Sequence, residues 1–327
     1  MDLKSLLNVT AVDFTEALKT QPALGQLLFG VGAVLVLKFV LSTFQAFYRF
    51  FLRPGKKLRK FGEWAVVTGA TDGIGKAYAF ELARQGLSLL LISRTETKLR
   101  DTAAEIKSKY PNVEVHILSI DFGNFNEDAQ AKVKQATKGL DVGVLINNVG
   151  QSYDFPMYFD ELSDEHVHAL VDLNVTSTLY MTRLLLPSMV AKRRGAVVNL
   201  ASAASRNPSP LLSLYSGAKS FVELFSQSLD AEYKGRGIRV QVQTPLFVAT
   251  KLAKIRKASL TVPSPAGYAK AAVRFIGYED SVSPYWSHAF QLYLMSCMPK
   301  SLLSIIVLNM HAGLRKRGLK KKVQKSA

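Results

Sequence analysis

Two residues with chemically active side chains, Tyr215 and Lys219, lie four positions apart in a stretch with helical periodicity. It is the only Tyr-x-x-x-Lys in the sequence. The spacing places both side chains on one face of a helix, one turn apart. A phenol titrates near about pH 10, and a neighbouring ammonium group lowers its pKa, so the pair is suited to giving a proton to a substrate oxygen.

Three polar features accompany this pair. Ser202 follows the apolar run at residues 196–201, Asn147-Asn148-Val149-Gly150 closes another apolar run, and Asn174 lies in a helical stretch. A serine hydroxyl placed beside the phenol would hold a carbonyl oxygen and strengthen its hydrogen bond as charge develops there. The structural alternatives are that Ser202 caps a turn and that Asn174 is a hydrogen-bonded helix residue.

A glycine-rich turn follows the first apolar run, in the sequence Thr68-Gly69-Ala70-Thr71-Asp72-Gly73-Ile74-Gly75. Glycines between a strand and a helix let the backbone approach a pyrophosphate at the positive helix N-terminus. The next apolar run ends at Ser93-Arg94, where an NAD site usually has an acidic residue. An arginine suits a 2′-phosphate, so we expect NADPH and the reducing direction; the alternative is a surface arginine.

The elements that must position these residues alternate along the chain. Six apolar runs, each separated from the next by a helix-length amphipathic stretch, lie at residues 64–68, 87–93, 113–120, 142–148, 196–201 and 238–244. Alternation of this kind predicts an α/β fold, a Rossmann-type doubly wound parallel sheet. Runs that are nearly continuously apolar, rather than alternating, fit strands covered by helices on both faces.

The order TGATDGIG, NNVG, Asn174, Ser202 and YSGAK resembles the classical short-chain dehydrogenase/reductases over about residues 62–277. The segments NNVGQSYDFPMYFDEL and FVATKLAKIRKASLTVPSP, with the basic linker, are similar to the branch of that family that reduces very-long-chain 3-oxoacyl-CoA. Near relatives of this branch include 17β-hydroxysteroid dehydrogenases. The family's Pro-Gly is here Pro245-Leu246 and its NNAG is NNVG, two departures that also fit the branch.

The resemblance implies roles for individual residues. Tyr215 would be the general acid, Ser202 would hold the carbonyl oxygen, Lys219 would also bind the nicotinamide ribose, and Asn174 would anchor a water that relays protons to Lys219. The cofactor-binding residues would be Gly69, Thr71, Gly73, Ile74 and Gly75 at the phosphates, Arg94 at the 2′-phosphate, Asp121 at the adenine, Asn148 near the adenosine ribose, and also Tyr215, Lys219 and Val248. An Asp after a strand is more often a turn cap, which is the alternative for Asp121.

Residues 23–52 form an apolar stretch whose charged residues are Lys38 and Arg49, long enough to cross a bilayer with tilt. We expect a transmembrane anchor rather than a cleaved signal peptide; the alternative is a buried core helix. The basic linker at residues 53–61 predicts that everything downstream faces the cytosol. The short N-terminal segment, residues 1–22, would then be lumenal, with a sequon at Asn8-Val9-Thr10.

We expect the catalytic domain at residues 62–280, an apolar segment at 281–311 and a basic tail at 312–327. The apolar segment is too short in each half to span a bilayer, so it predicts a membrane-associated hairpin, with a lid over the substrate cleft or a core helix pair as alternatives. The tail suits anionic lipids or coenzyme A phosphates; the alternative is a solvated disordered tail.

The formal net charge of +17 accompanies no nucleic-acid motif, which favours a membrane partner over nucleic acid. The single cysteine, Cys297, excludes an intramolecular disulfide and leans toward a reducing compartment. No metal site is expected.

The resemblance implies NADPH-dependent reduction of a long 3-oxoacyl-CoA to the 3-hydroxyacyl-CoA, the second step of fatty-acid elongation, at the endoplasmic reticulum membrane. Partners would be the acyl-CoA substrate, membrane lipid, subunits of an elongation complex and a second copy of the chain. The alternatives are a hydroxysteroid or other lipid-ketone oxidoreductase and an inactive scaffold subunit of an elongation complex. Intact Ser202, Tyr215 and Lys219 disfavour the scaffold.

Overall fold

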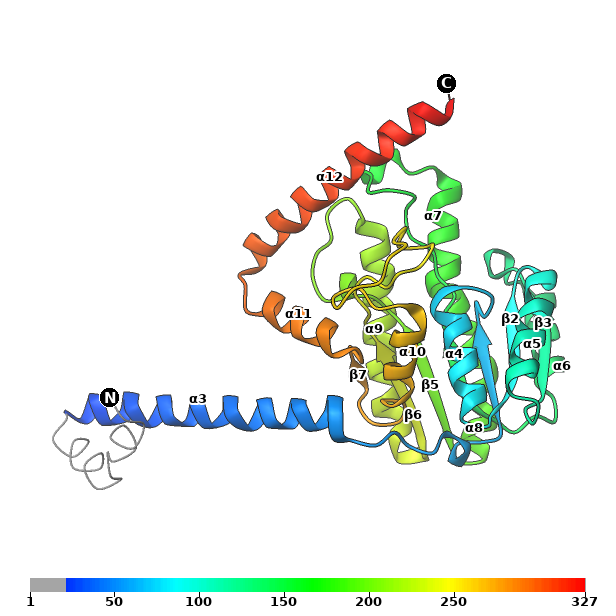
Figure 1. Ribbon diagram of the computed structural model, residues 1–327, viewed down its shortest axis with the longest axis horizontal. Helices are drawn as coiled ribbons and strands as arrows, with labels where there is room; N and C mark the ends of the chain where they lie inside the picture. The colour runs from blue at the N-terminus through cyan, green and yellow to red at the C-terminus, as the bar shows by residue number, and fades with distance from the viewer. Residues whose placement is uncertain (1–21, 327) are drawn as a thin grey trace. The chain divides into compact units, whose positions relative to one another are not determined.

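The computed structural model describes residues 22–326 (Figure 1). Contacts divide the chain into two units, Met1–Arg53 and Pro54–Ala327. The predicted sequon at Asn8 and nearly all of the predicted N-terminal segment lie outside the described residues.

The second unit is built on a seven-stranded parallel sheet in the order β3-β2-β1-β4-β5-β6-β7. The strands are β1 (Trp64–Thr68), β2 (Ser88–Ser93), β3 (Val115–Ser119), β4 (Val142–Asn147), β5 (Gly195–Leu200), β6 (Ile238–Gln243) and β7 (Ser281–Val282). The order reverses between β1 and β4, so the carboxyl ends of these two strands are the topological switch point of the sheet. The predicted doubly wound parallel sheet is confirmed.

Helices cover both faces of this sheet. The main ones are α4 (Gly73–Arg84), α5 (Glu96–Lys109), α6 (Glu127–Thr137), α7 (Asp164–Val171), α8 (Ser177–Ala191), α9 (Ser213–Tyr233) and α10 (Pro265–Val273). Alternate strand residues point to opposite faces, and those on one face pack against α4, α5 and α10. Residues on the other face pack against α6 and α8. This double burial explains the nearly continuous apolar character of the central strands β1, β4 and β5.

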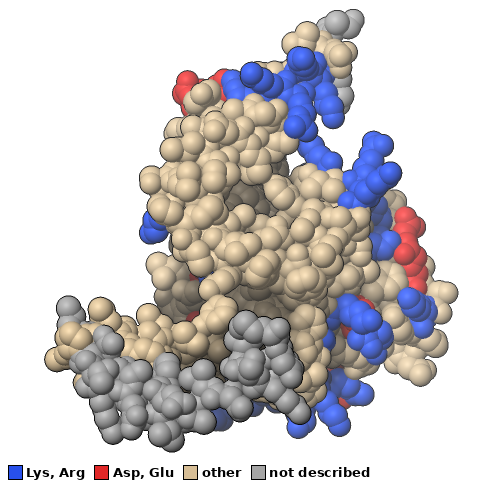
Figure 2. Space-filling view, turned by 60° about the vertical axis from the view of Figure 1, so that its left-hand side comes forward, with Lys and Arg blue, Asp and Glu red and all other residues tan. Residues whose placement is uncertain are grey.

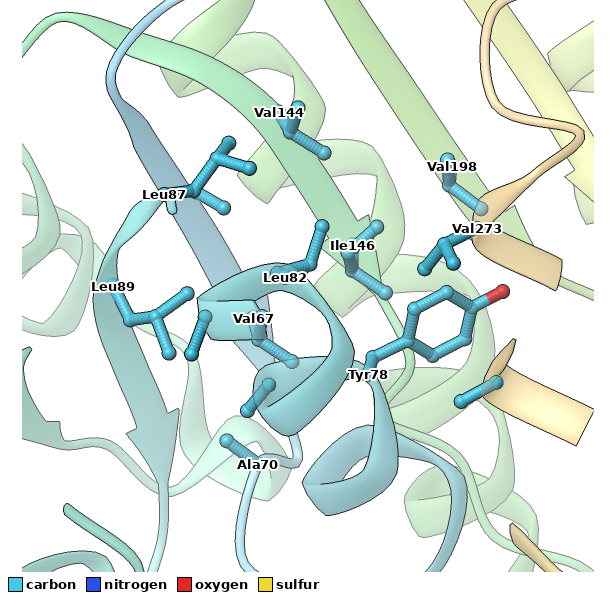
Figure 3. Close-up of a cluster of buried hydrophobic side chains, with 14 of the residues drawn as sticks. Val67, Ala70, Tyr78, Leu82, Leu87, Leu89, Val144, Ile146, Val198 and Val273 are labelled. Atoms are coloured by element: carbon cyan, nitrogen blue, oxygen red, sulfur yellow. The ribbon is translucent and has the colours of Figure 1, made fainter. Parts of the chain in front are cut away.

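Figure 3 shows the core beneath α4. Leu82 and Tyr78 project from α4 toward strand residues such as Val67 and Ile146. Tyr78 is fully buried, and its hydroxyl donates a hydrogen bond to the Gln243 side chain of β6. Burial of that phenol is therefore accompanied by a polar partner, which offsets part of the desolvation penalty.

In the first unit, α3 (Ala23–Phe47) continues into a π-helical turn, η1 (Tyr48–Leu52). Among the described residues, Gly25–Leu52 is the one helical stretch long and apolar enough to cross a membrane, and none of its most apolar window is buried. At about 1.5 Å per residue its 28 residues reach about 42 Å, more than a hydrocarbon core of about 30 Å.

The chain ends in two helices, α11 (Trp286–Ser296) and α12 (Lys300–Ser326). Strand β7 precedes them and begins one residue beyond the predicted catalytic domain. Two residues are too short to give a periodic signal, so the sequence pattern did not reveal β7. Helix α12 runs without a break across the predicted boundary between residues 311 and 312, because its basic residues are also good helix formers.

Candidate active site

The glycine-rich turn joins β1 to α4 at the carboxyl edge of the sheet. Gly69 and Gly73 have φ angles of +64° and +54°, a left-handed conformation that favours glycine. The Asp72 carboxylate caps α4 by accepting a hydrogen bond of 2.7 Å from the Gly73 N–H. The Thr71 hydroxyl lies 3.0 Å from that of Ser93, which ties the turn to the end of β2.

The end of β4 is held against the same turn. The Asn148 side-chain amide donates to the carbonyl oxygens of Thr68 at 3.1 Å and Gly69 at 3.2 Å. A Cβ atom at Gly75 would collide with that amide and with the Gly69 carbonyl. Asn148 therefore fixes the backbone of the turn, and Gly75 lets the first turn of α4 approach it closely. Ile74 lies between the two helix glycines.

The other predicted cofactor residues lie along the same edge. Arg94 directly follows β2, and its side chain is exposed while its carbonyl accepts a bond of 2.9 Å from the Ser119 hydroxyl. Asp121 follows β3 and caps a short 3-10 helix, accepting 3.0 Å from the Gly123 N–H. Val248 is buried in the loop after β6. The cap, which was the alternative for Asp121, is therefore present in the structure.

An ion pair that the sequence did not reveal joins the glycine-rich turn to the loop after β6. Lys251 Nζ lies 2.7 Å from the Asp72 carboxylate. Partial burial alone would raise the pKa of Asp72, but the hydrogen bonds from Lys251 and from Gly73 outweigh it and lower that pKa. Nothing in the spacing of two residues 179 positions apart identifies such a pair before the loop is placed.

Tyr215 and Ser202 meet above the end of β5. Tyr215 is half-buried in the first turn of α9, and Ser202 lies two residues past Leu200, the last residue of β5. Burial raises the pKa of Tyr215, and a hydrogen bond with the Ser202 side chain partly offsets that rise. The Ser202 hydroxyl also accepts 3.2 Å from the Ala204 N–H, so the turn cap that was its alternative is present as well.

Lys219 lies one turn further along α9, with its side chain 5% exposed. Its Nζ atom donates 2.9 Å to the Leu200 carbonyl and lies 5.9 Å from the centroid of the Tyr215 ring. Burial lowers the pKa of Lys219 to about 8. The predicted net lowering of the Tyr215 pKa is therefore wrong for the protein alone, because burial penalises the charged form of the phenol and raises that pKa.

Asn174 is fully buried in a π-helical turn, η5 (Asp172–Thr176), that joins α7 to α8. Its side-chain amide donates 2.8 Å to the carbonyls of Leu170 and Gln151, which stabilises the wider turn. π-Helical turns inside helices are frequent at functional sites. A Cβ atom at Gly150 would lie 2.8 Å from Asn174 Oδ1 and 3.1 Å from Lys219 Nζ, so glycine lets both side chains reach the same point.

These residues fit a nicotinamide dinucleotide. The turn that Gly69, Gly73 and Gly75 form has no room for a Cβ atom at Gly75, and it ends at the N-terminus of α4, which favours phosphate. Tyr215, Ser202 and Lys219 lie together at the carboxyl end of β5, on the same side of the sheet as the glycine-rich turn. Among the described residues, no group of His, Cys, Asp and Glu could hold a metal ion.

Comparison with known sequences agrees with this site. The family model of the short chain dehydrogenases matches residues 63–260. The chain is 44% identical to the very-long-chain 3-oxoacyl-CoA reductase-B of Danio rerio, over 91% of this chain and 97% of the relative. It is 38% identical to the very-long-chain 3-oxoacyl-CoA reductase of Coprinopsis cinerea, over 98% of both.

Solved structures give the same family. A structure of a 7β-hydroxysteroid dehydrogenase superposes with a TM-score of 0.69 at 25% identity, over 76% of this chain and 98% of that one. A short-chain dehydrogenase from Sphingobium yanoikuyae in complex with NADPH gives 0.61 at 27% identity, over 72% and 96%. The chain therefore belongs to the short-chain dehydrogenase family, as an oxidoreductase that uses a nicotinamide cofactor.

Proposed function

We propose that this protein reduces long- and very-long-chain 3-oxoacyl-CoA to 3-hydroxyacyl-CoA with NADPH, the second step of fatty-acid elongation. The observation that carries the proposal is the similarity, over nearly the whole length of both chains, to very-long-chain 3-oxoacyl-CoA reductases of a fish and a fungus. Similarity confined to the cofactor-binding half would support only the family. Here it covers 98% of the chain, including the loops after β4 and β6.

The bound nicotinamide would supply the hydride that adds to the carbonyl carbon. Tyr215 would give its hydroxyl proton to the carbonyl oxygen, while Ser202 donates a hydrogen bond to the same oxygen as charge develops there. The ammonium of Lys219, 5.9 Å from the tyrosine ring centroid, would stabilise the phenolate left behind. Asn174 would hold a water in the relay that restores the proton to Lys219 and Tyr215.

The proposed cofactor contacts follow from where each residue lies. Gly69, Thr71, Gly73, Ile74 and Gly75 surround the N-terminus of α4 and would line the phosphates, with Asp121 at the adenine, Asn148 near the adenosine ribose and Val248, Tyr215 and Lys219 on the nicotinamide side. The exposed guanidinium of Arg94 would pair with the 2′-phosphate, which is the support for NADPH over NADH.

We place the protein at the endoplasmic reticulum membrane with its catalytic domain in the cytosol. The support is the apolar helix Gly25–Leu52, followed by the basic linker Arg53, Lys56, Lys57, Arg59 and Lys60. A substrate with a long acyl tail would be concentrated in that bilayer. Subunits of an elongation complex and a second copy of the chain remain the proposed protein partners.

The test is to incubate the purified full chain in detergent with NADPH and a long 3-oxoacyl-CoA, and to identify the 3-hydroxyacyl-CoA by mass spectrometry. Tyr215→Phe keeps the ring and removes the proton donor, so we expect a loss of about 10²–10⁴-fold in kcat. NADPH that binds without being consumed would refute the proposal.

A steroid ketone is the second candidate substrate, favoured by the structural similarity to a 7β-hydroxysteroid dehydrogenase. Both substrate classes are apolar, so a single preparation should be given 3-oxoacyl-CoA and a 17-ketosteroid in parallel. A higher kcat/KM for the steroid would replace the first proposal with the second.

A further inference from the structure

Helices α11 and α12 each carry a stripe of large apolar side chains that the rest of the domain does not cover. On α11 the stripe is spaced i, i+3 and i+4, and it consists of Phe290, Tyr293 and Leu294. On α12 the corresponding residues are Leu302, Ile305, Ile306 and Met310, of which Ile305 is 57% exposed. These spacings place each set on one helix face.

The opposite face of α12 is fixed to the loops that border the active site. Leu303 and His311 are buried, and the His311 ring donates a hydrogen bond of 2.6 Å to the Pro210 carbonyl in the loop after β5. Arg315 binds Glu161, in the loop after β4, through two hydrogen bonds, one of 2.5 Å. The guanidinium lowers the pKa of the Glu161 carboxyl. The apolar stripe therefore keeps a defined orientation relative to the site.

All charged residues from Ser281 onward are basic. From Ser281 to the end of the sequence there is no Asp or Glu, whereas there are eight lysine and arginine residues. Lys316, Arg317 and Lys320 continue the outward face of α12 beyond its apolar stripe, by the same helical spacing. Figure 2 shows broad uncharged surface on the side that carries α11 and α12, with basic side chains gathered toward the end of α12.

The second unit begins at the amino ends of the strands, opposite the carboxyl ends where the site lies. Tyr278, in the loop that precedes β7, donates 2.8 Å to the Pro54 carbonyl, and Lys56 donates 2.5 Å to the Gly277 carbonyl of the same loop. In a parallel sheet that loop lies at the amino ends of the strands, whereas α11 leaves β7 at the carboxyl ends, beside the site. The linker from the anchor thus starts away from the mouth of the active site.

From these observations we propose that the outward face of α11 and α12 docks on an anionic bilayer surface. The apolar stripes lie at the boundary of headgroups and acyl chains, and the basic end of α12 contacts the headgroup phosphates. Attachment through Gly25–Leu52 holds the domain at a high effective concentration near the bilayer, so the contact needs little affinity of its own. Docking turns the loops after β4 and β5 toward the lipid.

Cys297 provides a probe between the two helices that form this face. It is the single cysteine of the chain, is exposed, and lies in the turn between α11 and α12. The full chain is labelled there with an environment-sensitive fluorophore and reconstituted into vesicles of equal parts phosphatidylcholine and phosphatidylserine. A matched control carries Cys297→Ser with Lys132→Cys, which puts the label at an exposed position on α6 of the same anchored protein.

We expect the label at residue 297 to emit at shorter wavelength than the label at residue 132, and to be quenched by nitroxide-bearing lipids. Emission and quenching equal to those of the control would overturn the proposal. A blue shift without lipid quenching would also overturn it, because the face would then be covered by protein, such as a second copy. Vesicles of phosphatidylcholine alone should reduce the quenching at 297; unchanged quenching would refute the contact of the basic end with headgroups.

A second measurement connects the face to substrate entry and rests on the proposed function. The double variant Ile305→Ser with Ile306→Ser removes two exposed apolar side chains that take no part in the chemistry. In vesicles we expect KM to rise for a long-chain 3-oxoacyl-CoA and to stay unchanged for a water-soluble four-carbon one. Equal changes for both substrates would refute entry from the bilayer. A wild-type chain that reduces neither substrate would refute the proposed function, and the fluorescence result would still decide the docking.

Discussion

Replacing Lys219 with methionine tests, through protein stability, whether this buried side chain carries a charge in the folded protein. The lysine is 5% exposed, and its ammonium donates 2.9 Å to the Leu200 carbonyl. Burial lowers the pKa of Lys219 from its ordinary 10.5 to about 8, so the folded protein holds this charge at neutral pH against a desolvation penalty. Methionine has a similar length and carries no charge, so Lys219→Met removes that penalty together with the hydrogen bond.

The size of the effect follows from the two pKa values. The lowering of the Lys219 pKa from 10.5 to about 8 corresponds to about 3 kcal/mol at neutral pH. Between pH 8 and 10.5 the unfolded chain binds a proton that the folded chain does not, so the free energy of unfolding rises with pH in this window. From pH 7 to pH 9.5 the wild type should gain about 2 kcal/mol relative to Lys219→Met. Loss of the hydrogen bond to the Leu200 carbonyl destabilises Lys219→Met by about 1.5–3 kcal/mol. This loss is nearly the same at every pH below 8.

The assay is unfolding of the full chain by guanidinium chloride in detergent at pH 7 and pH 9.5, followed by the fluorescence of the buried Trp64. Comparing wild type with Lys219→Met at each pH cancels the titration of all other groups. Lys132→Met, on the exposed side of α6, is the matched control and should change the difference by less than about 0.5 kcal/mol. A difference between wild type and Lys219→Met that is the same at both pH values would refute the assignment of a buried, charged lysine.

Three further predictions concern the site. If Lys219 acts as its ammonium form, kcat/KM for reduction should fall as pH rises through about 8, and a profile flat to pH 9.5 would contradict this. Arg94→Ala should weaken NADPH binding by about 10- to 100-fold, the equivalent of one charge-assisted hydrogen bond, and leave NADH binding unchanged; equal losses for both cofactors would show that Arg94 does not contact the 2′-phosphate. Gly75→Ala should destabilise the protein by about 1–3 kcal/mol, because its methyl group would meet the Asn148 amide and a backbone carbonyl. The control is Gly217→Ala, where the added methyl group would meet nothing within 4 Å. Equal Tm values for the two variants in calorimetric unfolding would disprove the close packing around Gly75.

Much of the fold was predictable because it depends on local pattern. Apolar runs of strand length that alternate with amphipathic stretches are enough to indicate a parallel sheet covered on both faces, and six of the seven strands follow from them. Strand β7 was not predictable, since two residues carry no period. The Tyr215 and Lys219 pair, the glycine-rich turn and the position of Arg94 after β2 were predictable for the same reason, because each is a short spacing next to a strand or inside one helix.

The long-range contacts were not predictable, because they depend on where separate loops meet. Lys251 reaches Asp72 only once the loop after β6 lies across the glycine-rich turn. The direction of the Tyr215 pKa shift was mispredicted because a helix spacing shows that Lys219 is near, but not that burial penalises the charged form of each group. Burial is a property of the assembled domain.

The sequence by itself determined the type of sheet, the glycine-rich turn after β1, the spacing of the tyrosine and lysine pair, and the apolar helix Gly25–Leu52 with its basic flank, since each depends on residues that are neighbours along the chain. Tertiary structure alone decided that Asn174 and Lys219 converge on Gly150, and that Arg315 fixes α12 over Glu161. It also decided that α11 and α12 follow β7 at the carboxyl ends of the strands, where the site lies. Those contacts join residues tens to more than a hundred positions apart, and only the packing of helices onto the sheet brings them together.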